Sequence, residues 1–426
     1  MEAKNKKLTL KQRSLILKKK HSTFHFLSVA VLAGVLAILL AGLSVVDALH
    51  ASSAAQAAQS KDTSKSSADG VFSAVFVGNM NFGRNESSVS DGYGFDTLFG
   101  NTLDVLDGAD YAFGNLECTL VKNIKNYKKT DGKDEYFYAS DKVAESLYDA
   151  GFTAVQVANN HTVDYGKKGL AHTISSLSKA GVTPVGAGED LPTAQEPALT
   201  VADGLVVKTI AATDVPVTGT TATLDRRGVL TFDSGDVYQM VHDASETADL
   251  VVVGAHWGYE YSRQVSEDQQ SIAHALIDAG ADIVIGTHSY SLQPIERYKD
   301  GIIFYDLGNF ISDDTYVRAR DSVAVRLNVQ KDGSAEFELT PLRIKSGIPG
   351  VTSDPLSTAR TWSMLTRQLD PDSYEMRDNV MHIPFATINR SAYAAIQEEE
   401  RANDAAMVDP SGKSSKIKID EESEED

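Results

Sequence analysis

Apolar segments of strand length alternate along this chain with segments of helical pattern, and this alternation restricts the possible folds most. The run VFSAVFV at 71–77 leads into a glycine-containing turn, and the helix-like DKVAESLYDA at 141–150 precedes the apolar FTAVQVANN. Further apolar runs lie in LVVVGAHWG, ADIVIGTHS and IIFYDLGNF. Strand, polar turn, helix and next strand in this order predict an α/β layered domain.

Polar residues fall just past the ends of these apolar runs. They are Asn79, Asn115, Glu117, Asn159 to His161, His256, His288 and Asn309. Ligands bind at this edge of open α/β sheets, so the shared position predicts one site assembled from several loops. Each residue alone has a simpler interpretation, because Asn or His after a strand is ordinarily a hydrogen-bonded turn residue. Because all of them share this position, we favour one assembled site over separate turn residues.

The residue types at these positions indicate a metal centre. Glu117 offers a carboxylate, Asn160 an amide oxygen, and His256 and His288 offer imidazole nitrogens, a mixture that suits Zn, Mn or Fe. His161, beside Asn160, is placed to protonate a leaving group or to stabilise negative charge. The chemistry that needs these groups is metal-assisted hydrolysis or transfer at a phosphoryl or acyl centre.

The N-terminal sequence predicts a membrane anchor. Residues 1–25 form a basic segment that we expect in the cytoplasm, and 26–46 is a run of 21 residues without a charge. At about 1.5 Å per residue this run matches a hydrocarbon core of about 30 Å. A cleaved signal peptide is the alternative, with small residues near Ala57 for cleavage, but the length of the apolar run favours an uncleaved anchor. Residues 47–70 are a flexible linker in this interpretation.

Charge and cysteine content narrow the possible partners of the remaining chain. Residues 1–46 hold eight basic residues and one acid, so the rest retains 32 basic and 58 acidic residues, a formal charge of −26. So acidic a domain repels nucleic acid and attracts divalent cations. Its single cysteine, Cys118, allows no intrachain disulfide and predicts stability from a large core. We expect the last residues, 411–426, to form an acidic disordered tail.

Six segments in order carry a resemblance to a known family. They are VGNMNFGR, FGNLECTL, VANNHTVDYGKKGL, VVGAHWGYEY, AGADIVIGTHSYSLQPIE and FYDLGNF. In order and spacing they resemble the CapA-type poly-γ-glutamate capsule synthesis family, a branch of the calcineurin-like metallophosphoesterase superfamily. The resemblance runs from about Val71 to about Ser312. It implies a four-layer α/β/β/α sandwich over residues 71–345, followed by a C-terminal extension at 346–410.

The resemblance also implies roles for individual residues. Glu117 takes the place of the metal-bridging carboxylate, Asn160 that of the asparagine ligand and His161 that of the histidine facing the substrate. His256 and His288 match ligands of the second metal. Arg84 and Glu260 match residues that commonly line the family's pocket, so we expect them near the reaction.

Two departures from the family pattern concern one metal position. Asn79 stands where the family usually has Asp, and Tyr290 stands where it usually has a second His. An amide and a phenol remove a charge and a good donor, so we expect one metal position to be weak or empty, with Asn79 at most a weak ligand. The other position keeps Glu117, Asn160, His256 and His288 and should bind one ion tightly.

Three functions are compatible with the sequence. The first is a membrane-anchored extracytoplasmic protein in synthesis, attachment or release of capsule or another surface polymer, with hydrolase or transferase activity. The second is a metallophosphoesterase-like module that binds an anionic polymer or its synthesis machinery without turnover. The third is a purely structural surface protein. Metal content and polymer turnover distinguish them.

Overall fold

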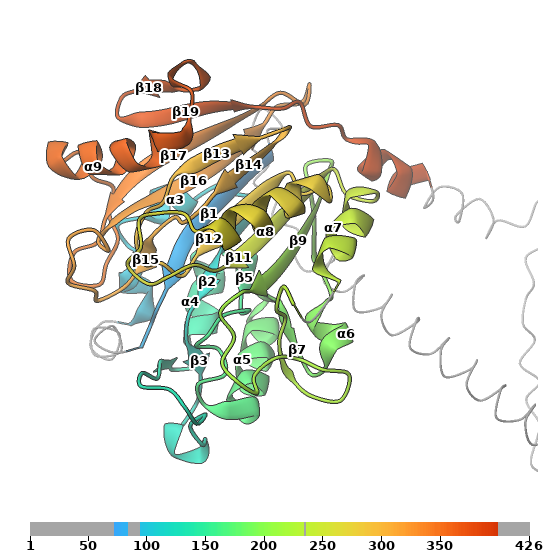
Figure 1. The fold of residues 1–426 in the computed structure, drawn as a ribbon, viewed down its shortest axis with the longest axis vertical. Helices are drawn as coiled ribbons and strands as arrows, with labels where there is room; N and C mark the ends of the chain where they lie inside the picture. The colour runs from blue at the N-terminus through green and yellow to red at the C-terminus, as the bar shows by residue number, and fades with distance from the viewer. Residues whose placement is uncertain (1–71, 84–93, 234–235, 399–426) are drawn as a thin grey trace, which may run out of the picture. The chain divides into compact units, whose positions relative to one another are not determined.

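The computed structural model describes residues 72–83, 94–233 and 236–398 (Figure 1). Within these ranges nine strands form a larger mixed sheet and six form a smaller mixed sheet. Two short ribbons complete the strand content of the described ranges, β3 (Thr119–Leu120) with β4 (Tyr138–Ala139) and β7 (Ala187–Gly188) with β10 (Gly228–Val229). The predicted α/β class is confirmed.

The larger sheet has its parallel strands at one side and antiparallel strands at the other. In spatial order it contains β18 (Glu375–Arg377), β19 (Val380–Phe385), β17 (Ala335–Arg343), β16 (Asp321–Val329), β1 (Phe72–Met80), β2 (Tyr111–Leu116), β5 (Ala154–Gln156) and β6 (Thr183–Val185), and β15 (Asn309–Ile311) pairs with β1. Strands β1, β2, β5 and β6 run parallel. Every residue of β1 is buried, which explains its continuous apolar run.

The smaller sheet carries the second half of the strand-end residues. Its spatial order is β13 (Ile295–Tyr298), β14 (Gly301–Phe304), β12 (Ile283–Thr287), β11 (Leu250–His256), β9 (Leu205–Thr213) and β8 (Ala198–Ala202). Strands β9, β11, β12 and β14 are parallel. Their carboxyl ends therefore lie at one edge, and β11 ends there with His256.

The two sheets pack face to face through one apolar core. Phe304 of β14 contacts Phe337 of β17 edge to face, with ring centroids 5.5 Å apart. The hydroxyls of Tyr111 in β2 and Thr209 in β9 lie 2.7 Å apart, which adds a buried polar link between the sheets. The same core takes in side chains of β1, β11, β12 and β16. Aromatic pairs of this kind add about 1 kcal/mol beyond their buried area.

Helices cover the two outer faces of the paired sheets (Figure 1). The outer face of the larger sheet packs on η1 (Phe95–Leu98), α3 (Leu103–Leu106), α4 (Val143–Asp149) and α5 (Gly166–Ala180). The outer face of the smaller sheet packs on α6 (Leu191–Ala194), α7 (Val237–Ser245) and α8 (Glu267–Asp278). Helix α8 begins in a capping box of Ser266 and Gln269. The order of layers is thus helix, sheet, sheet, helix.

The chain after residue 345 continues the larger sheet. Strand β19 pairs antiparallel with β17, and β18 pairs with β19. Helix α9 (Pro355–Leu365) and the turns η3 (Thr366–Gln368) and η4 (Pro371–Ser373) lie between β17 and β18, and η2 (Ile124–Asn126) lies between β3 and β4. Strands β16 and β17, which precede this part of the chain, pair over their full lengths.

Several predictions concern residues outside the described ranges. They are the basic segment 1–25, the span 26–46, the linker 47–70, Arg84 and the acidic tail 411–426. Within residues 72–83, 94–233 and 236–398, no helix combines the length and apolar character that crossing a bilayer requires.

Candidate metal centre

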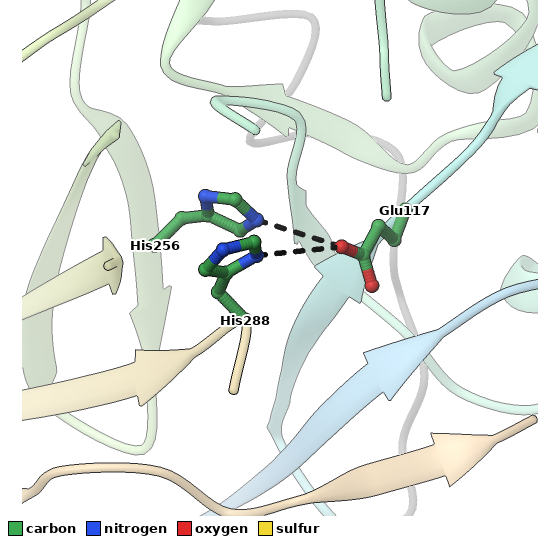
Figure 2. Close-up of side chains that lie close together, drawn as sticks. All are labelled: Glu117, His256 and His288. Carbon is green, nitrogen blue, oxygen red and sulfur yellow. Dashed lines mark ion pairs between the residues drawn. The ribbon is translucent and has the colours of Figure 1, made fainter. Parts of the chain in front are cut away.

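Three of the predicted ligands converge between the two sheets (Figure 2). Glu117 directly follows β2, His256 ends β11 and His288 directly follows β12. Nε2 of His256 lies 3.5 Å and Nδ1 of His288 4.0 Å from the same oxygen, Oε1 of Glu117. All three residues are buried, and their ligand atoms lie within 4.8 Å of one another. The strand-end register thus brings one carboxylate and two imidazoles together.

Each of the four predicted ligands has one side-chain atom, able to coordinate a metal ion, that makes no hydrogen bond in the described part of the chain. These atoms are Oε2 of Glu117, Oδ1 of Asn160, Nε2 of His256 and Nδ1 of His288, and all four are buried. Contacts of 3.5 and 4.0 Å between the imidazoles and Glu117 are too long to satisfy these atoms. Because buried polar atoms are nearly always paired, four unpaired donors on the predicted ligands fit a cation.

The protonation states of the site also suit a cation. Burial acts to raise the pKa of the Glu117 carboxyl, but the nearby imidazoles of His256 and His288 outweigh it and hold that pKa well below its usual range. Burial and the neighbouring His288 lower the pKa of His256 to about 4. At neutral pH the site therefore holds a carboxylate beside a neutral His256, the forms that bind metal.

Hydrogen bonds behind His256 fix which nitrogen faces the site. The Thr213 hydroxyl donates to the carbonyl oxygen of His256 at 3.2 Å, so its oxygen is left to accept from Nδ1 of the His256 ring at 2.9 Å. A proton on Nδ1 leaves the lone pair on Nε2, the atom nearest Glu117. The contact with Thr213 therefore orients His256 for coordination through Nε2.

His288 sits on a strained loop that Asp306 holds in place. The φ angle of His288 is 102°, a backbone conformation that costs about 1–3 kcal/mol for a residue with a side chain. Buried Asp306 accepts hydrogen bonds from the backbone N–H groups of Ser289 and Gly308, both at 2.7 Å. Burial raises the pKa of Asp306 to about 7. Strain concentrated at His288 is typical of a functional site.

His161 is held by three side chains. Its Nδ1 lies 2.8 Å from Oδ2 of Asp164 and 3.1 Å from Nζ of Lys133. Its ring stacks on Phe137 with centroids 3.8 Å apart. Lys133 also forms an ion pair with Asp164 and donates to the carbonyl oxygen of Asn160 at 2.6 Å. Because Nδ1 is engaged, Nε2 of His161 is the nitrogen left for proton transfer.

Asn79 belongs to a row of four asparagines that crosses the edge of the larger sheet. Its Nδ2 lies 3.5 Å from Oδ1 of Asn309, and its Oδ1 accepts from Nδ2 of Asn115 at 2.8 Å. Nδ2 of Asn159 in turn donates to Oδ1 of Asn115 at 2.9 Å. The oxygen of Asn79 is thus already hydrogen-bonded, unlike the donors of the four other predicted ligands.

Comparison with known families matches residues 73–314 to the model described as bacterial capsule synthesis protein PGA_cap. The chain belongs to this family. The predicted resemblance to CapA-type capsule proteins is confirmed.

The capsule-family assignment extends to individual relatives. The chain is 32% identical over 391 residues to the capsule biosynthesis protein CapA of Bacillus anthracis, covering 89% of this chain and 93% of the relative. It is 36% identical over 310 residues to the PGA biosynthesis protein CapA of Bacillus subtilis, covering 72% and 80%. The solved calcineurin-like phosphoesterase YfkN of Bacillus subtilis covers 80% of this chain and 99% of its own at 11% identity and a TM-score of 0.34, too low to support an inference.

Tyr290 supports Glu117 in this capsule-family chain. Its hydroxyl donates to Oε1 of Glu117 at 3.1 Å. Burial and the charge of Glu117 raise the pKa of Tyr290 well above its usual value, so the phenol stays neutral. A neutral donor on Oε1 leaves Oε2 of Glu117 available. Tyr290, which stands where the resemblance implies a second histidine, thus orients the carboxylate of Glu117.

Glu260 and Arg84 complete the predicted site residues. Glu260 is exposed on the loop after β11, outside the group of Glu117, His256 and His288, and its charge helps to raise the pKa of Tyr290 beside that group. Arg84 lies outside the described residues. Sequence reasoning missed Asp164 and Lys133, which hold His161. Asp164 stood within a quoted segment, three residues after His161, whereas nothing in the pattern marked Lys133.

Proposed function

We propose that this protein acts extracytoplasmically on an anionic surface polymer, with poly-γ-glutamate as the first candidate, using one divalent transition metal ion. Family membership supports a role in capsule or poly-glutamate synthesis. The observation that carries the catalytic part is the set of four unpaired donor atoms on Glu117, Asn160, His256 and His288. We further propose that the sandwich is of the metallophosphoesterase type.

The proposed roles of the residues follow from their surroundings. Glu117, Asn160, His256 and His288 would hold one ion of Mn, Zn or Fe, which when bound lowers the pKa of water and polarises a carbonyl or phosphoryl oxygen. His161 would give a proton to the leaving group from Nε2, because Asp164 and Lys133 occupy Nδ1. The stack on Phe137 keeps the ring in one orientation.

Turnover of the polymer tests this function. Full-length protein in detergent, loaded with Mn, should shorten poly-γ-glutamate, measured by gel filtration of the products. We expect His161→Asn to slow the reaction by about 100-fold or more, because a positioned acid contributes about 10²–10⁴-fold. His172→Asn is the matched control, since His172 also pairs with an aspartate, Asp141, at 3.1 Å. Equal rates for the two variants contradict the role of His161.

A polymer-binding or assembly module is the second candidate, and the row of asparagines favours it. With the Asn79 oxygen hydrogen-bonded and Tyr290 bound to Glu117, a second ion would lack ligands, which weakens two-metal chemistry. In this case the wild-type protein binds the polymer and leaves its length unchanged. The same gel-filtration experiment therefore separates the two candidates.

The proposed location is the cell envelope, with the anchor at residues 26–46 in the membrane. The basic segment 1–25 before the uncharged run 26–46 and the names of the capsule relatives support it. Added protease should digest the domain in cells stripped of their wall with the membrane intact. Full protection of the domain contradicts the proposed orientation.

A further inference from the structure

A row of tyrosine rings leads from the candidate metal centre to the surface. Tyr290, whose hydroxyl binds Glu117, lies 5.6 Å from Tyr261 between ring centroids, and Tyr261 lies 5.0 Å from Tyr316. Tyr290 is partly buried, whereas Tyr261 is 44% and Tyr316 66% exposed. The row therefore gives an extended substrate an aromatic surface that continues from Glu117 to solvent.

The loops that carry these rings are tied to the loop of His288. The backbone N–H of Tyr261 donates to the carbonyl oxygen of Ser289 at 2.7 Å. The side-chain amide of Gln293 donates to the carbonyl oxygens of Ser262 and Gln264, both at 3.2 Å. These bonds bracket Arg263. The backbone of Arg263 is consequently held at a fixed place relative to the loop of His288.

Arg263 and Arg318 line a small hollow beside that loop. The hollow is shallow and open to solvent, and its wall contains Ser291, one residue after Tyr290. Asp321 in the same wall is already committed, because Arg360 donates to both of its oxygens at 2.6 and 2.7 Å and Arg343 also pairs with it.

The two other arginines of the hollow have no such partner. Within the described ranges the side chains of Arg263 and Arg318 make no hydrogen bond or ion pair. Burial lowers the pKa of Arg263, and the positive charges of Arg318 and Arg367 lower it further, which outweighs the opposing effect of Asp321. The hollow is therefore positive in a domain that is strongly negative overall.

We propose that Arg263 and Arg318 bind an oxyanion carried on the substrate chain, one or more units away from the bond at the metal centre, while Tyr261 and Tyr316 pack against the chain between the two points. This inference rests on the proposed function. A guanidinium pair recognises carboxylate and phosphate alike, so the ligand is a chain of acidic groups of either kind.

Binding of two polymers tests the site and separates the two sources of oxyanion. Fluorescently labelled poly-γ-glutamate and inorganic polyphosphate are titrated with full-length protein in detergent, and anisotropy gives Kd. The double variant Arg263→Gln/Arg318→Gln should bind the preferred polymer at least about tenfold more weakly than wild type. Its Kd should also depend less on salt. Preference for poly-γ-glutamate identifies a carboxylate ligand, and preference for polyphosphate a phosphate ligand.

Arg297→Gln is the matched control. Arg297 is exposed on β13 and pairs with Ile302 at the amino end of β14, which is the sheet edge opposite to His288. Its variant should bind like wild type. The charge-preserving Arg263→Lys/Arg318→Lys should recover part of the affinity, which excludes misfolding as the cause. Equal Kd values for wild type and the Gln double variant overturn the proposal.

Metal content keeps this test separate from the proposed function. If the wild-type protein holds no metal and leaves the polymer intact, but the Gln double variant still loses affinity, the oxyanion site stands while the catalytic proposal fails. If metal and turnover are present and the Gln double variant binds both polymers like wild type, the oxyanion site alone is wrong.

Discussion

The two halves of the candidate centre differ in whether their buried polar groups are hydrogen-bonded. In the half formed by Glu117, His256 and His288, donor atoms are buried without hydrogen-bond partners. In the half formed by Asn79, Asn115 and neighbouring asparagines, amide groups bind one another in a row. We call the first the unpaired half, because its buried polar atoms are available to a charged ligand. We call the second the paired half, because its amides already hydrogen-bond one another.

The difference has an energetic meaning. A buried donor or acceptor without a partner costs about 1–3 kcal/mol, so four of them together destabilise the metal-free fold considerably. The strained φ of His288 adds to this cost. Binding of an ion to the folded state alone would offset both. The amide row needs no ligand, because its members are already paired.

The largest expected effect comes from removing a ligand of the unpaired half. His288→Ala should lower metal affinity by about 100-fold or more, so that dialysed protein falls from about one equivalent of metal to nearly none. Metal analysis by mass spectrometry measures this. His274→Ala is the control, because His274 pairs with Glu296 on the outer side of the smaller sheet. Retention of a full equivalent by His288→Ala contradicts the assignment of this half.

The next effect concerns the paired half and appears in stability. Asn115→Ala leaves Oδ1 of Asn79 without a partner and leaves Nδ2 of Asn159 with only the carbonyl oxygen of Leu116, so we expect a loss of about 2–3 kcal/mol in unfolding free energy. Urea unfolding of the metal-free protein measures it. Asn328→Ala, in β16 of the same sheet, is the control and should cost less than about 1 kcal/mol. A change of metal content in Asn115→Ala would show that the halves are coupled.

The third effect is a pH dependence that only the unpaired half can have, since amides do not titrate. Burial lowers the pKa of His256 to about 4 in the folded state, below its ordinary 6.5. Between these values the unfolded chain binds more protons, so stability of the metal-free protein falls as pH falls. From pH 6.5 to 5 the loss is about 2 kcal/mol. His256→Asn should remove this slope in urea unfolding, and an unchanged slope would assign it to other groups.

The sequence predicted the unpaired half better than the paired one. Glu117 and His288 follow parallel strands and His256 ends one, and the carboxyl ends of such strands meet at one edge, so position in sequence nearly determines position in space. The role of Asn79 depends instead on register: it lies opposite Asn115 on one side and Asn309 on the other. No local pattern contains that information.

The same distinction applies beyond the centre. Lys133 reaches His161 from a loop between β3 and β4, and its neighbours in sequence carry no periodic signal that would place it there. The short segment Val380–Phe385 contains a proline and becomes a strand because β17 offers an edge to pair with. Contacts between residues far apart in sequence determine both placements, and local sequence patterns do not contain them.

The smallest expected effect comes from a double variant that gives the paired half groups able to bind a metal ion. Asn79→Asp with Tyr290→His restores the family's charge and imidazole, so we expect a second equivalent of metal with weaker affinity than the first. At five times its Kd this second ion should add about 1 kcal/mol of stability, seen as a shift in urea unfolding on titration with Mn. Neither single variant should bind it, because each leaves one ligand missing. A second equivalent in wild-type protein would mean that the asparagine row opens to admit an ion, and the two halves would then be alike.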